Sequence, residues 1–138
     1  MAVTALIVWL LTALGGFFML RLWLARGGMR APADTRPTRF PAPVVFGHLL
    51  LAVAGLIIWI VYMATDAAAL AWIALAVLVV IALLGFTLLA RWLPTQRPTA
   101  AQDEHGPPEQ AIPLLVAGVH GLLAVATVIL VLIAAVTG

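Results

Sequence analysis

Four long apolar stretches alternate with short polar segments along the chain. We predict membrane-spanning helices at about residues 2–24, 43–64, 67–93 and 113–136. Each stretch has about 20 residues or more, enough for a helix to cross the ~30 Å hydrocarbon core of a bilayer. Leu, Ala, Val and Ile fill these stretches without the two-residue alternation that marks a barrel strand. The pattern therefore predicts an all-α chain whose residues 1–138 form one transmembrane four-helix bundle.

The composition also indicates a membrane protein. Of 138 residues, 65% are hydrophobic and 9% are charged, whereas soluble domains carry about 25% charged residues. The chain has no Cys, which excludes disulfides, thiolate metal sites and thiol nucleophiles. All seven basic residues are Arg. Because they gather around two loops, we expect no nucleic-acid partner. The Lys-free, Ala- and Arg-rich composition resembles that of proteins from GC-rich bacteria.

The arginines predict an orientation. Five of them lie in or beside the first loop, namely Arg21, Arg26, Arg30, Arg36 and Arg39, and two more flank the third loop, Arg91 and Arg97. The positive-inside rule then places both loops in the cytoplasm and both termini outside the cell. The first span lacks the basic start of a signal peptide, so we expect it to be retained. We predict a multi-pass protein of the bacterial inner (cytoplasmic) membrane.

Aromatic residues gather near both ends of the spans, as in the aromatic belts of membrane proteins. Trp9, Trp59, Tyr62 and Trp72 lie near the ends with few arginines, and Trp23, Phe40 and Trp92 near the Arg-rich ends.

The second half of the chain resembles the first. With a shift of 72 residues, Pro41 aligns with Pro113 and His48 with His120, and six of the seven positions from His48 onward are identical. With a shift of 69 residues, Gly16 and Phe17 align with Gly85 and Phe86, and Trp23 with Trp92. We predict two tandem helical hairpins, about 1–65 and 67–138, related by a pseudo-two-fold axis along the membrane normal.

Two histidines lie inside the predicted spans, where an ionisable side chain is costly and points to function. His48 and His120 each follow a proline by seven residues, so both lie ~10 Å from the cytoplasmic end of their helices. If the second and fourth helices face each other, the two imidazoles point at one central site. That geometry suits axial ligation of a single haem b iron by His48 and His120.

Small and basic residues near the histidines would suit such a group. We expect Gly47, Gly118 and Gly121, with further help from Gly15, Gly16 and Gly85, to leave clearance for a flat ring beside its ligands. At the cytoplasmic interface, Arg21, Arg39 and Arg91 could pair with the haem propionates.

The paired histidines and their glycines in a four-helix frame resemble small membrane-bound b-type cytochromes and the haem-bearing membrane anchors of respiratory enzymes. The resemblance implies electron transfer, with a menaquinone or ubiquinone, a larger respiratory complex or a second copy of the chain as candidate partners besides membrane lipid. The chain departs from membrane cytochromes that stack two haems, because its outer half has no His. One haem would not bridge the membrane.

Other interpretations stay open. The histidines could form hydrogen bonds between helices in a cofactor-free accessory subunit of a larger complex, or serve a proton, quinone or other metal function. A carrier of haem or quinone in assembly is a third possibility. We interpret Asp103, Glu104, His105 and Glu109 as solvated loop charges rather than a metal site. No other catalytic constellation is visible, so we expect an electron-transfer or accessory subunit rather than an enzyme on its own.

Overall fold

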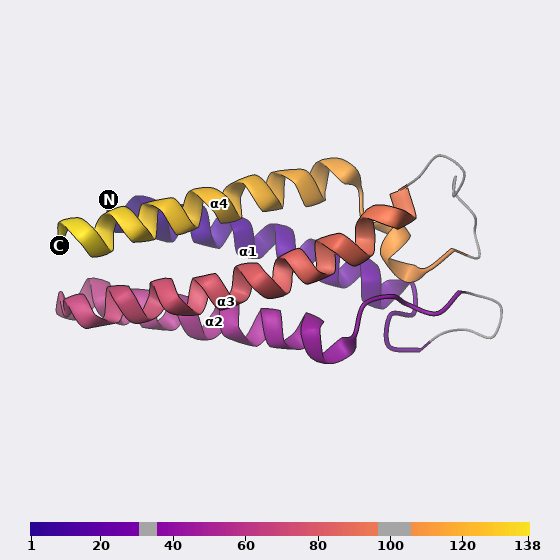
Figure 1. Cartoon of the computed structure of the whole chain (residues 1–138), viewed down its shortest axis with the longest axis horizontal. Helices are drawn as coiled ribbons and strands as arrows, with labels where there is room; N and C mark the ends of the chain where they lie inside the picture. Colours follow the sequence, from indigo (N-terminus) through magenta and orange to yellow (C-terminus); the bar gives the residue numbers. More distant parts are fainter. Residues whose placement is uncertain (31–35, 97–105) are drawn as a thin grey trace.

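The computed structural model describes residues 1–30, 36–96 and 106–138. Four long α-helices dominate this part of the chain: α1 (Ala2–Ala25), α2 (Ala42–Thr65), α3 (Ala68–Trp92) and α4 (Leu114–Thr137). Two short 3₁₀ helices accompany them, η1 (Leu93–Gln96) after α3 and η3 (Pro108–Ala111) before α4. The long helices run alongside one another, with both termini at one end and the α1–α2 and α3–α4 connections at the other (Figure 1). We call the latter the loop end.

The prediction of an all-α chain with four potential membrane spans is confirmed. All four long helices have the length and apolar composition to cross a bilayer, and their ends lie within one residue of the predicted limits. Pro41 and Pro113 are the N-caps of α2 and α4, where the missing N–H of proline breaks no helical hydrogen bond. Asp66 ends α2 in the left-handed conformation, with φ 51°.

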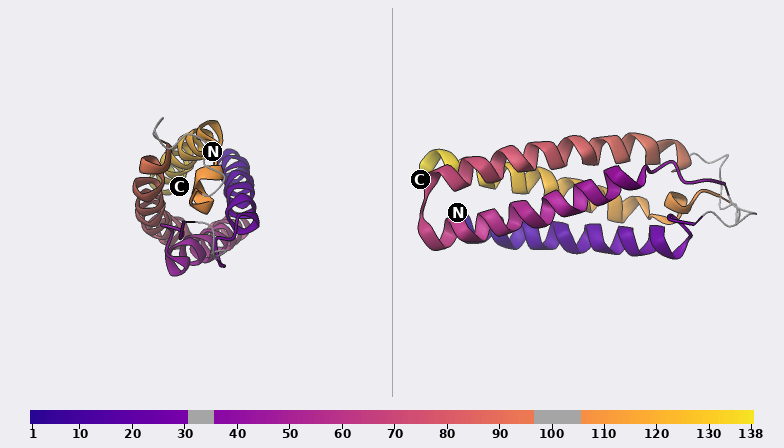
Figure 2. Two further views of the ribbon diagram at one scale, coloured as in Figure 1. Left: turned by 90° about the vertical axis from the view of Figure 1, so that its right-hand side faces the viewer. Right: turned by 90° about the horizontal axis from the view of Figure 1, so that it is seen from below.

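The helices form a closed ring around a common axis (Figure 2, left). The two most extensive interfaces join α2 with α3 and α1 with α4, while α3 also packs on α4 and α1 touches α2 over a smaller area. Each helix therefore has two neighbours in the ring. As a result, α2 and α4 lie diagonally opposite and face each other across the axis.

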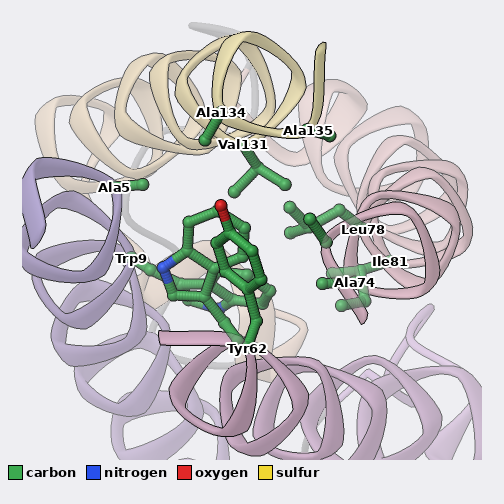
Figure 3. Packing of buried hydrophobic residues seen from close by; sticks show 11 residues of the cluster. Ala5, Trp9, Tyr62, Ala74, Leu78, Ile81, Val131, Ala134 and Ala135 are labelled. Carbon is green, nitrogen blue, oxygen red and sulfur yellow. The ribbon is translucent and has the colours of Figure 1, made fainter. Parts of the chain in front are cut away.

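Buried side chains form two separate clusters along this axis. The larger, terminal-end core lies near the chain termini, and all four helices contribute to it, as Figure 3 shows. It contains Ala5, Trp9, Trp59, Tyr62, Ala71, Ala74, Leu78, Ile81, Val131, Ala134 and Ala135. The smaller, loop-end cluster contains Trp23, Phe40, Trp92 and Ile112.

Most of the aromatic residues near the span ends belong to these clusters and therefore point into the bundle. Trp59 is fully buried and donates its indole N–H to the Ala2 carbonyl oxygen at 3.2 Å. Trp72, in contrast, is 50% exposed on the bundle surface. The interior positions are favoured because large rings fill the bundle axis. The indole N–H of Trp59 finds a carbonyl partner there, whereas the buried indole nitrogen of Trp92 has no hydrogen-bond partner among the described residues.

Between the two clusters lies a loosely packed layer. One segment of each long helix contributes to this layer, and none of these segments contains a fully buried residue. The segments are residues 10–22, 41–54, 82–91 and 113–126. Close-packed interiors leave few voids larger than a water molecule, so inward-facing side chains would ordinarily be fully covered here. We use the name loosely packed layer for this stretch of partly exposed side chains, and both histidines lie in it.

Candidate site formed by two facing histidines

The structure brings His48 of α2 and His120 of α4 together in the loosely packed layer. Their ring centres lie 6.4 Å apart, and the ring planes are inclined by 54°. Each histidine follows the N-cap proline of its helix by the same number of residues, and the two helices run in the same direction, so both rings lie at one depth. Because α2 and α4 are diagonal, the rings meet near the bundle axis.

A backbone carbonyl of a neighbouring helix holds each ring. The Nδ1 of His48 lies 3.0 Å from the Ile81 carbonyl oxygen of α3, and the Nδ1 of His120 lies 2.9 Å from the Thr12 carbonyl oxygen of α1. A carbonyl oxygen only accepts, so both Nδ1 atoms carry hydrogen and donate it. In a neutral imidazole, Nε2 then keeps a free lone pair. Among the described residues, neither Nε2 forms a hydrogen bond.

The glycines in contact with the rings belong to α1 and α3. A methyl group added at Gly16 would lie 3.3 Å from Cε1 of His120, and one at Gly85 would lie 3.3 Å from Cε1 of His48. Gly15 would place its methyl group 3.5 Å from Nδ1 of His120. Each imidazole therefore packs directly on the backbone of the adjacent helix, next to the carbonyl that holds it.

The other three glycines do not contact the histidine of another helix. A methyl group at Gly47 would meet only Leu84, at 3.9 Å, and at Gly118 or Gly121 it would have no neighbour within 4 Å. Gly118 and Gly121 instead line an open apolar groove of about 460 Å³ between α3 and α4. The groove also contains Phe86 and Leu122. The sequence alone does not indicate which face of an apolar helix points inward. It therefore could not separate the glycines that face the rings from those that face outward.

The three arginines expected near the site are exposed at its loop side. The Arg91 guanidinium donates through Nη1 to the Arg39 carbonyl oxygen at 3.0 Å, which ties the end of α3 to the segment before α2. Arg21 lies on the last turns of α1. All three therefore belong to the same end of the bundle, although no contact joins them to the imidazoles.

The interpretation of Glu109 as a solvated loop charge is wrong. Its side chain is fully buried in η3, where its carboxylate accepts hydrogen bonds from the Thr38 hydroxyl at 2.8 Å and the Arg39 amide at 2.7 Å. Burial is possible because these donors replace water around the charge. No local sequence signal separated Glu109 from the other loop acids. Asp103, Glu104 and His105 lie outside the described residues.

Two imidazoles at this distance could hold one metal ion between them if both Nε2 atoms turned towards it. The 6.4 Å between the ring centres is compatible with metal–imidazole bonds of about 2.0 Å to a shared ion. A hydrogen bond from the non-ligating ring nitrogen to a carbonyl is also the usual support of a metal-binding His. Within the described residues, no group of three or more His, Asp or Glu side chains offers another such site.

Comparison with protein families, with characterised proteins and with solved structures gives no match for this chain. Its function is therefore inferred from its own residues and their geometry.

Proposed function

We propose that this chain is a membrane electron-transfer protein, similar to b-type cytochromes, that holds one haem b between His48 and His120. The observation that carries the proposal is the pair of facing imidazoles, 6.4 Å apart, whose Nδ1 atoms are both bound to carbonyl oxygens. This arrangement leaves two Nε2 lone pairs for one iron. Haem b supplies reversible one-electron chemistry at its iron when it is bound.

The surroundings of the histidines support a flat prosthetic group. A bound group would have to be accommodated in the loosely packed layer, where the side chains between the two buried clusters are only partly covered. The protein's part is to fix the imidazoles through Ile81 and Thr12, to surround the group with apolar side chains, and to offer Arg21, Arg39 and Arg91 to its carboxylates at the loop end. Burial and nearby positive charge would tune the reduction potential.

A tandem duplication of a helical hairpin would explain the matched supports. Ile81 and Gly85, which contact His48, align with Thr12 and Gly16, which contact His120, under the same shift of 69 residues. Burial follows the same register in both halves. The aligned buried pairs are Ala5 with Ala74, Trp9 with Leu78, Trp23 with Trp92, Phe40 with Ile112, Trp59 with Val131 and Tyr62 with Ala134. Each half would thus hold the histidine of the other.

We place both termini outside the cell and the loop end in the cytoplasm of a bacterium, following the arginines. The chain has no Cys, so single cysteines at exposed positions test this directly. An impermeant thiol reagent added to intact cells should label Asp66→Cys and Gly138→Cys, whereas Arg26→Cys should be labelled only after lysis. Labelling of Arg26→Cys alone in intact cells would reverse the orientation.

The position of the site limits the electron partners. With both histidines towards the Arg-rich end and none in the outer half, one haem would exchange electrons on the cytoplasmic side. A membrane-soluble quinol, a larger respiratory complex or a second copy of this chain could be the partner. Electron transfer across the whole membrane would need a further cofactor on such a partner.

The first test is a reduced-minus-oxidised absorbance spectrum of the detergent-purified protein from cells supplied with haem. We expect sharp low-spin haem b bands in the parent and their loss in His48→Ala and His120→Ala. Gly118→Ala, a substitution away from both rings, should retain them. Reduction of the bound haem by a quinol analogue would separate electron transfer from a carrier function. A folded but colourless parent protein would overturn the proposal.

The alternative is a cofactor-free accessory subunit of a larger membrane complex. It is favoured by one observation: both imidazoles already join helices, α2 to α3 and α1 to α4, through hydrogen bonds to carbonyl oxygens. Such bonds contribute about 0.6 to 2 kcal/mol to helix association in membranes. In this case the histidine variants would lose stability while the parent protein showed no haem bands.

A further inference from the structure

The loop end of the bundle is closed from inside by part of the third connection. Viewed from that end, η3 lies within the ring of the four long helices (Figure 2, left). Pro108 and Glu109 are buried there, and Ile112 is only 4% exposed as a member of the loop-end cluster. We call residues 108–112 the plug. The loosely packed layer begins directly behind the cluster to which the plug belongs.

One polar network fastens the plug to the first connection. The Glu109 carboxylate accepts from the Thr38 hydroxyl and the Arg39 amide. The Thr38 oxygen in turn accepts the indole N–H of Trp23 at 2.9 Å and the amide of Phe40 at 3.1 Å. The hydroxyl thus uses its single hydrogen for Glu109 and both lone pairs for the other two donors. The network joins α1, the segment before α2, and η3.

The plug contains a fully buried carboxylate, which a loop that merely covers a helix end would not need. A fully buried carboxylate is expensive to desolvate and persists where donors hold it in place. Here its donors come from a segment some seventy positions earlier in the chain, so the contact adds a polar link between two connections that also meet through Phe40 and Ile112 in the loop-end cluster. Loss of one partner would leave a buried charge or a buried indole N–H unpaired, which costs more than the bond itself contributes.

We infer that residues 108–112 act as a plug that excludes water and small polar solutes from the loosely packed layer. The hydrogen bonds of the Glu109 carboxylate hold this plug in place, and we therefore call Glu109 the latch. The purpose of the plug rests on the proposed function, because solvent access alters the reduction potential and the retention of a buried haem. The plug itself is a property of the protein chain. It can therefore be tested whether or not haem is bound.

The test uses a cysteine reporter next to the cluster that contains Ile112 of the plug. Val45 packs against the loop-end cluster and lies three residues before His48, and the parent chain has no Cys to interfere. In lipid nanodiscs, Val45→Cys should react slowly with a charged, water-soluble thiol reagent. Adding Glu109→Gln or Thr38→Val should raise the labelling rate about tenfold or more, because local opening of the plug becomes easier.

Glu109→Gln is an informative variant because it keeps the size of the side chain and changes only its charge and hydrogen bonding. Its amide nitrogen would face either the Thr38 oxygen, which has no lone pair left, or the Arg39 N–H, which is itself a donor. The matched control is Asp66→Asn, which removes an acidic charge at the opposite end of the bundle. This control should leave the labelling rate of Val45→Cys unchanged.

Global unfolding must be separated from opening of the plug. A second reporter, Ala74→Cys, lies fully buried in the terminal-end core and should stay unlabelled in the Glu109 and Thr38 variants. Fast labelling of Val45→Cys in the parent background would overturn the plug. Equal slow rates in the parent, Glu109→Gln and Thr38→Val would overturn the latch. A colourless protein with the expected labelling pattern would instead reject the haem proposal and leave the plug intact.

Discussion

At the scale of single residues, the contact between an imidazole and a glycine decides how each histidine is oriented. The ring of His120 is held between the Thr12 carbonyl and the backbone at Gly16, and that of His48 between the Ile81 carbonyl and Gly85. Each ring therefore has a hydrogen bond on one atom and a close backbone neighbour at the next. A side chain at either glycine would act directly on ring position.

Gly16→Ala and Gly85→Ala should each destabilise the protein by about 1 kcal/mol, because the new methyl group lies 3.3 Å from Cε1 and the Nδ1 bond resists the shift. In an unconstrained helix, glycine to alanine is stabilising by up to about 1 kcal/mol. Thermal unfolding in detergent measures the difference. Gly118→Ala, with no neighbour within 4 Å, is the control, and an equal gain in all three variants would contradict the ring contact.

At the scale of elements, the connection between α2 and α3 depends on one unusual backbone conformation. Asp66 has φ 51° and donates its amide hydrogen to the Tyr62 carbonyl oxygen at 2.8 Å, which closes the last turn of α2. Ala67 then adopts an ordinary extended conformation with φ −76° before α3 begins. Reversal of the chain between these helices is thus achieved largely at a single residue.

Asp66→Val should lower the free energy of unfolding by about 1–2 kcal/mol, because a β-branched residue is unfavourable in the left-handed region. Asp66→Gly, free of that penalty, should leave it unchanged or raise it. The melting temperatures of the purified variants give the comparison. Ala67→Val, at the neighbouring residue with negative φ, should be tolerated, and a loss there as large as at Asp66 would argue against the backbone explanation.

At the scale of the whole molecule, the two halves of the chain fill three levels of the terminal-end core with side chains of complementary size. The aligned positions Trp59 and Val131 are both fully buried, and Trp9 and Tyr62 similarly align with the smaller Leu78 and Ala134. At these three pairs one large and one small side chain together reach close packing. The loop-end cluster differs, because its aligned pair Trp23 and Trp92 consists of two large buried rings.

Exchange of one such pair tests this complementarity. Trp59→Val should destabilise the bundle by about 2–4 kcal/mol through a cavity and a lost indole hydrogen bond, and Val131→Trp should be unfavourable through overpacking. In the double variant, the loss in free energy of unfolding should be smaller than the sum of the two single losses by at least about 1 kcal/mol. Reversible unfolding in mixed detergent micelles supplies all three values. Simple additivity would mean that the two positions do not share space.

Several features of the fold could be predicted from the sequence because they depend on local properties. The lengths of the apolar stretches determined the four helices, and Pro41 and Pro113 marked where two of them begin. Equal spacing from these prolines to His48 and His120 determined that both histidines lie at one depth. These conclusions need only the rise of a helix and the hydrophobicity of a bilayer.

Other features depend on contacts between distant parts of the chain. Nearly uniform apolar helices carry little information on which face points inward. Only the tertiary structure therefore placed α2 opposite α4 and turned Gly16 and Gly85, rather than Gly118 and Gly121, towards the rings. It likewise supplied the donors that permit Glu109 to be buried. Local sequence determined what each helix is and how deep its residues lie, whereas long-range packing decided which residues meet, because rotation about a helix axis is set by neighbours.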